Sequence, residues 1–341
     1  MKISKITVGM ILSCIIIIYN TKCTIKREAL GADNEIRVIC SEVDKVKIRK
    51  YLSMIFTDTI YTPEPEPYYN LKFSTPENYK KLKDQSQIVV AALDRNPSNT
   101  GYILMKQILS KEKFNYTENI DPIILSEDIY AKKQLFMIIN AKNEDTLISI
   151  INKKKNYIRE QFHRQFVNRQ SRYLFGDDRN KKLEDSLYHT FGWSLKIPWG
   201  WEIIKISPDS NFVWIGKEMP FQWIGVSWKK GYLFKDNISA GEFIWSWPQE
   251  NYGSIQFNDY KFELKESSDN TYKGWRAKGV WETIDVIKAK GGPFYSYLFY
   301  DEKNNKTFHI NFLIHHPGED KSIFMRQLDL IAKSFRVKRD L

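Results

Sequence analysis

The stretch DTLISIINKKKNYIREQFHRQF, residues 145–166, sets the organisation of the chain. Its apolar residues recur at steps of four and seven, which is the spacing of one helical face: Leu147, Ile151, Ile158, Phe162 and Phe166. The pattern predicts an amphipathic helix of about 25–30 residues that begins at Asp145. We expect its apolar stripe to pack against the sheet of a first domain while the helix continues toward a second.

The chain has 341 residues, more than the usual single-domain size of about 100–200 residues. We therefore predict an α+β fold with two domains, each an antiparallel or mixed sheet packed against helices, joined by the long amphipathic helix. The predicted parts are a signal or lipoprotein segment with a short tether (1–30), an N-terminal α+β domain (31–144), the basic helix with a connector helix (145–191), and a C-terminal sheet domain with a terminal helix (192–341).

Sequence before the long helix alternates between strand and helix patterns. EIRVIC (35–40) and SQIVVAALD (86–94) are typical of buried strands, and Leu135 to Asn140 predicts another. Helices are predicted over 41–56, with Ser41 as N-cap, and over 101–110.

Sequence after the long helix changes character. Strand-like alternation occurs over 193–205, 211–218, 223–228, 274–284, 293–301 and 307–316, and a final helix is predicted over 321–335. Aromatic residues in GWSLKIPWGW, FQWIGVSWKKGYLF and GEFIWSWP could stack on sugars or bases, but we interpret them as rows of a sheet.

The stretch YTPEPEPYYNLKF, residues 61–73, alternates proline and glutamate. Proline lacks a backbone donor and holds the preceding residue extended, so residues 62–67 should form a stiff, exposed, polyproline-like bridge from a helix to the next strand. Glu66, between Pro65 and Pro67, is held in a fixed direction. We expect it to have a specific hydrogen-bond or arginine partner.

The N-terminus predicts export. Two lysines in residues 1–5 precede an apolar run over 6–19, which matches a secretory segment and is too short for a membrane span of about 20 residues. ILSC (11–14) resembles a lipobox, and Cys23 lies beyond the whole run, so Cys14 and Cys23 are alternative lipid-attachment sites. Cys40 is left as a core residue, with no disulfide framework.

The formal net charge is +11, and residues 151–182 hold ten Lys and Arg against three acids. These bases spread around the long helix, whereas a nucleic-acid helix would gather them on one side. We expect no nucleic-acid partner. The basic face would at most contact anionic lipid headgroups or cell-wall polymers.

Motifs for catalysis are absent from the sequence: there is no phosphate loop, nucleophile elbow, HExxH or paired-cysteine site. His315 and His316 are adjacent in a strand and point to opposite faces. We therefore predict no catalytic residue, no metal and no cofactor, although spacing alone cannot show whether two carboxylates meet in space.

Several segments together resemble an uncharacterised family of exported lipoproteins of diderm bacteria: PEPEPYY, FVWIGKE, KGVWE, GGPFYSYLFYD and FMRQLDLIAKSF. The sequence departs from that pattern at Lys278 and Asp329, where arginine and glutamate are expected. The resemblance implies motif residues that could bind a partner: Pro65, Glu66, Pro67, Trp214, Gly279, Trp281, Ser296, Tyr297, Asp301, Arg326 and Gln327. The second half also resembles a PsbP-like α-β-α sandwich, through GWSLKIPWGW, FHINFLI and IAKSF.

These observations favour an exported, lipid-anchored binding or assembly module on the periplasmic side of the bacterial envelope, at the outer membrane. Its expected partners are the membrane, through the anchor, and envelope proteins or cell-wall polymer. Two alternatives stay open. One is a cell-wall or glycan hydrolase, which needs two carboxylates about 5–9 Å apart in a cleft. The other is a carrier of a small or lipidic ligand, which needs an enclosed apolar pocket.

Overall fold

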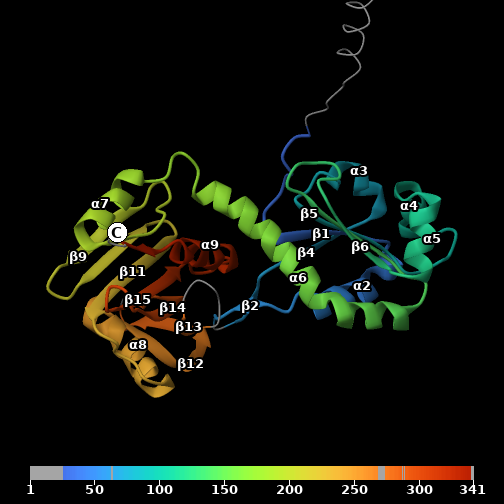
Figure 1. Ribbon diagram of the computed structural model, residues 1–341. Coiled ribbons are helices and arrows are strands. Elements are labelled where there is room, and N and C mark those ends of the chain that lie inside the picture. The colour runs from blue at the N-terminus through green and yellow to red at the C-terminus, as the bar shows by residue number, and fades with distance from the viewer. Residues whose placement is uncertain (1–25, 63, 268–272, 286, 288, 339–341) are drawn as a thin grey trace, which may run out of the picture.

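The computed structural model describes residues 26–62, 64–267, 273–285, 287 and 289–338. Figure 1 shows two lobes, each with its own sheet and helices, and the long helix α6 (Glu144–Leu174) extends from one to the other. The predicted α+β class, with two domains and a long joining helix, is confirmed.

The first domain contains a sheet of five strands: β1 (Glu35–Ile39), β4 (Asn70–Ser74), β5 (Gln87–Ala92), β6 (Ile123–Glu127) and β7 (Leu135–Asn140). Their order is β4-β1-β5-β7-β6, and all neighbours are parallel except β6 and β7. Every residue of β5 and β7 is buried, as expected for parallel strands that are covered on both faces.

Helices cover both faces of this sheet. α2 (Glu42–Ile55) and α6 lie on one face, while α3 (Tyr79–Leu82), α4 (Thr100–Ile108) and α5 (Lys111–Asn119) lie on the other. The Ser41 hydroxyl accepts a hydrogen bond from the backbone N–H of Asp44, which confirms the predicted N-cap. α5 is not among the predicted helices, because its sequence is mostly polar.

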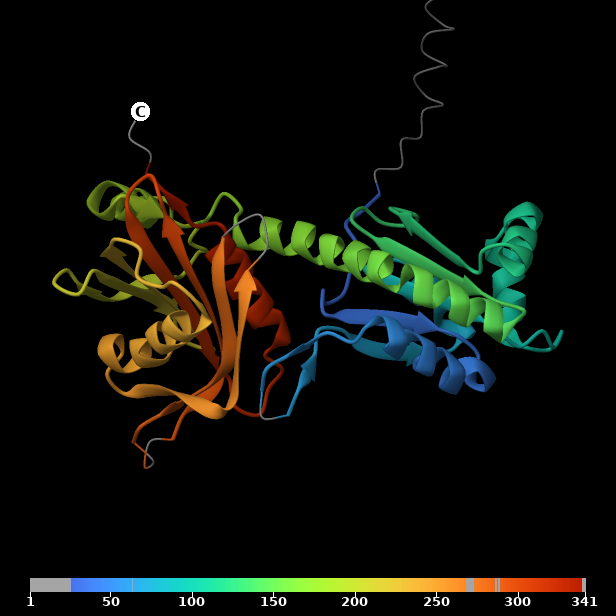
Figure 2. The ribbon, with the colours of Figure 1, turned by 60° about the horizontal axis from the view of Figure 1, so that its bottom comes forward.

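The apolar stripe of α6 packs as predicted. Four of its side chains are fully buried in one cluster with residues of β1, β5 and β7: Leu147, Ile151, Ile158 and Phe162. Phe166 extends the stripe to the second domain, where the guanidinium of Arg326 lies 3.3 Å from its ring centroid. Arg326 belongs to α9 (Ser322–Lys333), which lies between α6 and the second sheet (Figure 2).

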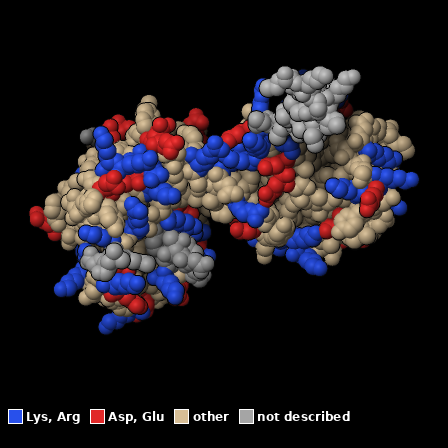
Figure 3. All heavy atoms as spheres, turned by 45° about the horizontal axis from the view of Figure 1, so that its top comes forward, with Lys and Arg blue, Asp and Glu red and all other residues tan. Residues whose placement is uncertain are grey.

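The basic side chains of α6 largely pair within the molecule. Five of them form ion pairs with acids of the first domain: Lys154 with Asp121, Arg159 with Asp58, Arg164 with Glu127, Arg169 with Asp33, and Arg172 with Glu28. On the face shown in Figure 3, basic and acidic residues are interspersed over both domains. The excess of charge in the sequence therefore does not produce a continuous basic surface on that face.

The second domain contains a seven-stranded antiparallel sheet with the order β12-β13-β14-β15-β11-β10-β9. Its strands are β9 (Glu202–Ser207), β10 (Phe212–Lys217), β11 (Phe221–Lys230), β12 (Ile255–Ser267), β13 (Gly274–Thr283), β14 (Gly291–Asp301) and β15 (Lys306–His315). β8 (Trp193–Ser194) and β16 (Arg336–Val337) pair separately.

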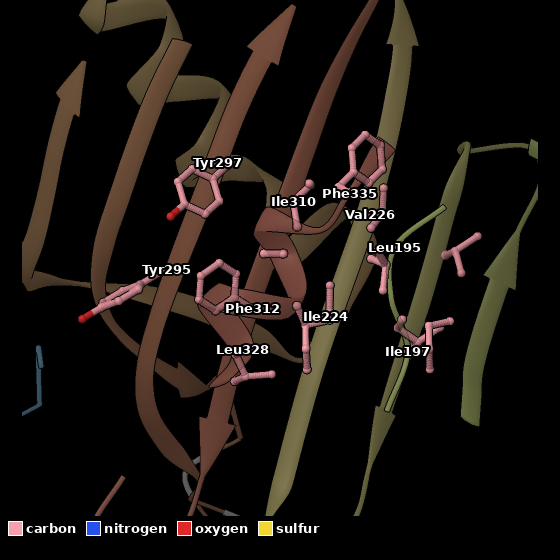
Figure 4. Close-up of a cluster of buried hydrophobic side chains, with 14 of the residues drawn as sticks. Leu195, Ile197, Ile224, Val226, Tyr295, Tyr297, Ile310, Phe312, Leu328 and Phe335 are labelled. Atoms are coloured by element: carbon pink, nitrogen blue, oxygen red, sulfur yellow. The ribbon is translucent and has the colours of Figure 1, made fainter. Parts of the chain in front are cut away.

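Each face of this sheet carries its own core. Alternating residues such as Ile224 and Phe312 pack with Leu328 of α9 on one face, and Figure 4 shows this cluster. α7 (Lys181–Phe191) adds Leu187 to the same side. On the other face, α8 (Asn237–Asn251) buries Ile244 and Trp247 against the opposite row of strand residues. Alternate residues of the strands therefore pack against helices on opposite faces of the sheet.

Two predicted elements differ in the structure. GEFIWSWP (241–248) was expected to form rows of a sheet, but it lies in α8, where an Asp236 capping box starts a helix that alternation alone did not indicate. The strand predicted over 193–205 is interrupted. Only β8 and the start of β9 are extended pairs, because residues 195–201 run across the core and bury Leu195 and Ile197.

The proline-rich stretch forms a hairpin that reaches the second domain. β2 (Thr59–Ile60) pairs with β3 (Glu66–Pro67), so the predicted simple bridge is wrong in form, although the chain does pass from helix α2 to strand β4. Ile60 is fully buried in the core of the second domain. At the hairpin, the Tyr61 hydroxyl donates to Glu263 at 2.8 Å and the Lys261 ammonium donates to the Thr62 carbonyl at 2.6 Å.

Candidate ligand-binding cavity

An open cavity of about 1090 Å³ lies at the β9 edge of the second sheet. Its walls come from the C-terminal end of α6, the turn before β9, the strands β9, β10 and β11, and one residue of α9. The aromatic lining residues are Tyr173, Trp199, Trp201, Trp214 and Trp223. This volume lies at the upper end of the range of about 300–1,000 Å³ for small-molecule sites.

The turn before β9 presents one tryptophan to solvent and buries the next. Gly200 has a φ of +75°, a conformation that favours glycine, and the chain reverses there. Trp199 is consequently 78% exposed at the rim, whereas Trp201 is 2% exposed and belongs to the core. Tyr173, near the end of α6, is the second exposed ring of the rim.

The hairpin of β10 and β11 supplies two polar side chains of the cavity. Lys217 and Gln222 are directly opposite each other in the antiparallel register, so both point to the same face. Burial lowers the pKa of the Lys217 ammonium, and no acid pairs with it among the described residues. Gln222 is almost completely buried, and its Nε2 has no hydrogen-bond partner among the described residues.

Trp214 of β10 and Trp223 of β11 lie on the face of the sheet opposite to Lys217 and Gln222. Their rings meet edge to face with centroids 5.3 Å apart, and the indole nitrogen of Trp214 has no partner in the described part of the chain. Gly216 is on β10, directly opposite Trp223 of β11. A Cβ at this position would lie 2.4 Å from the Gln222 carbonyl oxygen, so only glycine permits this close approach.

The carboxylates of the cavity lie in water. Asp178, Glu202 and Glu218 line it and all three are exposed. The remaining cation, Arg179, is paired with Glu184 at 3.1 Å. No group of three or more His, Cys, Asp or Glu that could hold a metal ion occurs among the described residues. No helix in the described part of the chain is long and apolar enough to cross a membrane.

Comparison with protein families divides the chain in two. Residues 29–175 match the model of a domain of unknown function (DUF8532), and residues 180–334 match that of another domain of unknown function (DUF4837). The two matches correspond to the two lobes of the structure. The matches support an uncharacterised family, while export, lipidation and the PsbP-like sandwich stay predictions.

Solved structures show only distant similarity. A mutant of the protein Mog1 shares 12% identity at a TM-score of 0.31, over 43% of this chain and 90% of that chain. The Saccharomyces cerevisiae Ran-binding protein Mog1p shares 13% at 0.30, over 43% and 90%. A protein from Bacteroides thetaiotaomicron shares 12% at 0.27, over 44% and 46%. No curated protein matches the chain. Scores this low support no conclusion about function.

Two of the sequence-predicted residues line the cavity: Trp214 and Gln327, both in the DUF4837 domain. Gln327 also belongs to the contact between the two domains, because its Nε2 donates to Gln170 Oε1 of α6 at 2.7 Å. Trp199, Lys217 and Gln222 were missed as site residues. Trp199 lies in GWSLKIPWGW and Gln222 in FQWIGVSWKKGYLF, which were interpreted as rows of a sheet, and Lys217 lies in the family-like segment FVWIGKE.

Four predicted residues lie between the domains instead of in the cavity: Pro65, Glu66, Pro67 and Arg326. Glu66 has the expected fixed partner, which is Lys321: the backbone N–H donates to Glu66 at 2.6 Å and the ammonium lies 2.7 Å away. The Arg326 guanidinium donates to the Tyr68 carbonyl at 3.1 Å and to the Tyr69 hydroxyl at 2.9 Å. These groups fix the DUF8532 and DUF4837 domains relative to each other.

The remaining motif residues serve the second sheet. The Trp281 indole donates to the Ile314 carbonyl at 3.0 Å, and Asn311 donates to the Ser296 hydroxyl at 2.9 Å. A Cβ on Gly279 would lie 2.1 Å from the Lys261 carbonyl oxygen. Asp301 accepts from the backbone N–H of Asn304 in the turn after β14.

Tyr297 donates to Asp329 beneath the sheet. Burial alone would raise the pKa of Asp329, but Lys333 and Arg276 hold it below its usual value. Asp329, where the family pattern has glutamate, is thus kept charged by neighbours of the same domain. Cys14, Cys23 and Pro63 lie outside the described residues.

Proposed function

We propose that the protein is a binding module, and that its binding site is the cavity at the β9 edge of the DUF4837 domain. The observation that carries the proposal is the combination of four tryptophans with polar groups that lack partners among the described residues, in an open cavity of about 1090 Å³. A small number of polar groups among aromatic and aliphatic side chains is typical of ligand sites.

A binding role is favoured over hydrolysis by the positions of the acids. Glycoside hydrolysis needs one carboxyl group held in its protonated form by apolar surroundings. The carboxylates that line this cavity, Asp178, Glu202 and Glu218, are all exposed. The cavity is also open at the rim formed by Trp199 and Tyr173, which fits a site that captures a group from outside better than an enclosed carrier.

We further propose that the module is exported and lipid-anchored in the bacterial envelope. The basic start and the apolar run over 6–19 support export, and Cys14 and Cys23 are the alternative attachment sites. The anchor would hold the cavity close to the membrane surface, where envelope proteins and cell-wall polymer are within reach.

Native mass spectrometry of the full chain, purified from membranes of its own host, tests the binding role. We expect one bound small molecule per wild-type chain and a much smaller bound fraction in Trp199→Ala. Tyr260→Ala is the matched control, because Tyr260 is an equally exposed ring (84%) on β12, at the opposite edge of the sheet. A wild-type chain without bound species, or equal loading of both variants, contradicts the proposal.

The anchor is tested by the intact mass of membrane-extracted protein. Cys14→Ala or Cys23→Ala should remove the mass of the lipid and move the protein to the soluble fraction, and the other substitution should have no effect. If neither substitution changes mass or partition, the lipoprotein proposal is wrong.

A further inference from the structure

We propose that the ligand of the cavity carries a carboxylate, which is bound between Lys217 and Gln222 while its apolar body lies against Leu174 and Trp201, which pack on the same face of the sheet. This inference rests on the proposed function and names the chemistry that the same site would recognise. It is carried by the register of β10 and β11, by the partners that these two side chains lack, and by the shape of the cavity.

Lys217 and Gln222 form a ready pair of donors. Residues directly opposite in an antiparallel pair have Cβ atoms about 4.5–5.5 Å apart and share one face of the sheet. Their longer side chains can converge on one carboxylate, so that one of its oxygens accepts from the ammonium and the other from the amide.

Both donors lack a counterpart among the described residues. Burial without a counter-charge disfavours the ammonium form of Lys217, and the buried Gln222 nitrogen has no acceptor among the described residues. An anion between Lys217 and Gln222 would supply a counter-charge to the ammonium and an acceptor to the amide nitrogen. The nearby acids do not supply it, because Asp178, Glu202 and Glu218 point into water and none forms an ion pair with Lys217.

A single negative charge fits better than a phosphate. A phosphate monoester carries a charge of about −1.5 to −2 and needs several donors. Lys217 is the only lining cation free to bind an anion among the described residues, since Arg179 is already paired with Glu184. One ammonium and one amide therefore match one carboxylate.

The rest of the cavity requires an apolar body. A carboxylate alone fills only a small part of about 1090 Å³, and the apolar residues of the remaining walls include Leu174, Ile203, Ile204 and the indole rings. Ligand affinity comes mostly from such apolar contact, while the polar pair fixes orientation. A free fatty acid and the C-terminus of an apolar peptide share this chemistry, so the experiment must separate the two sources.

Isothermal titration calorimetry of the full chain with matched ligands tests the proposal. One arm compares dodecanoate with dodecan-1-ol and with dodecyl phosphate. The other compares an acetylated apolar tripeptide that has a free C-terminus with its C-terminal amide. We expect the acid of one arm to bind about ten- to a hundredfold more tightly than its neutral counterpart, the range given by a lost hydrogen bond to a charged group.

Three variants locate the effect. Lys217→Met should abolish the preference for the acid, and Lys217→Arg should retain most of it. Lys205→Met is the matched control and should leave the preference unchanged, because Lys205 lies on the neighbouring strand β9 and does not line the cavity.

The possible results distinguish the carboxylate assignment from the existence of the binding site. If neutral and acidic ligands bind equally, if the phosphate binds most tightly, or if Lys217→Met keeps the preference, the carboxylate assignment is overturned and the binding site remains. If no ligand of either arm binds, the carboxylate assignment is overturned as well, and loss of bound material in Trp199→Ala would still support a binding site of different chemistry.

Discussion

His309 lies in the core of the second domain, and neither ring nitrogen has a hydrogen-bond partner among the described residues. Burial lowers its pKa from 6.5 to about 3. Between these values the unfolded chain binds a proton that the folded chain does not, so stability falls as the pH drops below 6.5. The loss should reach on the order of 4 kcal/mol at pH 3.

His309→Phe should flatten this pH dependence, because the ring is kept and the titrating group is removed. Urea unfolding at pH 7.0 and at pH 4.5 measures it. His189→Gln is the control, since His189 is exposed and should leave the wild-type slope intact. An unchanged slope in His309→Phe would mean that other groups cause the acid sensitivity.

Glu66 joins the hairpin to the start of α9 through Lys321. Glu66→Gln keeps the size of the side chain and removes its charge, so we expect a loss of about 1–2 kcal/mol in the free energy of unfolding. Glu64→Gln, two residues earlier and exposed, should change it by less than about 0.5 kcal/mol. Equal effects of the two substitutions would reduce Glu66 to part of a spacer.

Single residues were predictable where their role is local. Ser41 caps the helix that follows it, and the flanking prolines of Glu66 indicated a fixed direction. Lys217 and Gln222 could not be predicted in the same way, because nothing in their spacing shows that a strand pair places them opposite each other or that no acid is near. Pairing and burial depend on the whole sheet.

The hairpin of β2 and β3 contributes to a core far away in sequence. Ile60 is fully buried among residues of the second domain. Ile60→Ala should cost about 2–5 kcal/mol, the usual effect of truncating a buried aliphatic side chain.

All ten tryptophans lie between residues 193 and 281, so tryptophan fluorescence reports the unfolding of the second domain alone. A shift of that transition by Ile60→Ala would show that the hairpin stabilises the other domain. Val46→Ala is the control, because Val46 is exposed on α2 of the first domain and its truncation should leave the transition in place.

At the level of elements, long periodic patterns were reliable and mixed ones were not. The stripe of α6 recurs from Leu147 to Phe166 and left no other interpretation. In α8 the aromatic residues of GEFIWSWP alternate as they would in a strand, and the helix is decided by its cap and by packing of Trp247 against the sheet. At α8, tertiary packing therefore outweighs the strand-like pattern of the local sequence.

The whole molecule should unfold as one unit. Arg326 is buried between Phe166, Tyr68 and Tyr69, and it bonds to both tyrosines. We expect tryptophan fluorescence and far-ultraviolet circular dichroism to give coincident transitions for the wild type. Arg326→Met should cost about 2–4 kcal/mol and separate the two transitions, since cation–π contact and charged hydrogen bonds are lost together.

Two results would contradict this expectation: separate transitions in the wild type, or coincident ones in Arg326→Met. The division into two domains was predictable from chain length and from the change in pattern. Their fixed attachment was not, because it depends on contacts such as Asn34 with Asp320, which are separated by almost the whole described chain.

The burial of Ile60 in the core of the second domain also limits how the gene can be rearranged. A segment encoded before residue 68 completes a core encoded after residue 180, so recombination between the two coding regions would separate a side chain from the place it fills. A second domain joined to a foreign neighbour would have to acquire a substitute for the hairpin before it became stable. The two regions should therefore be inherited, lost and duplicated together.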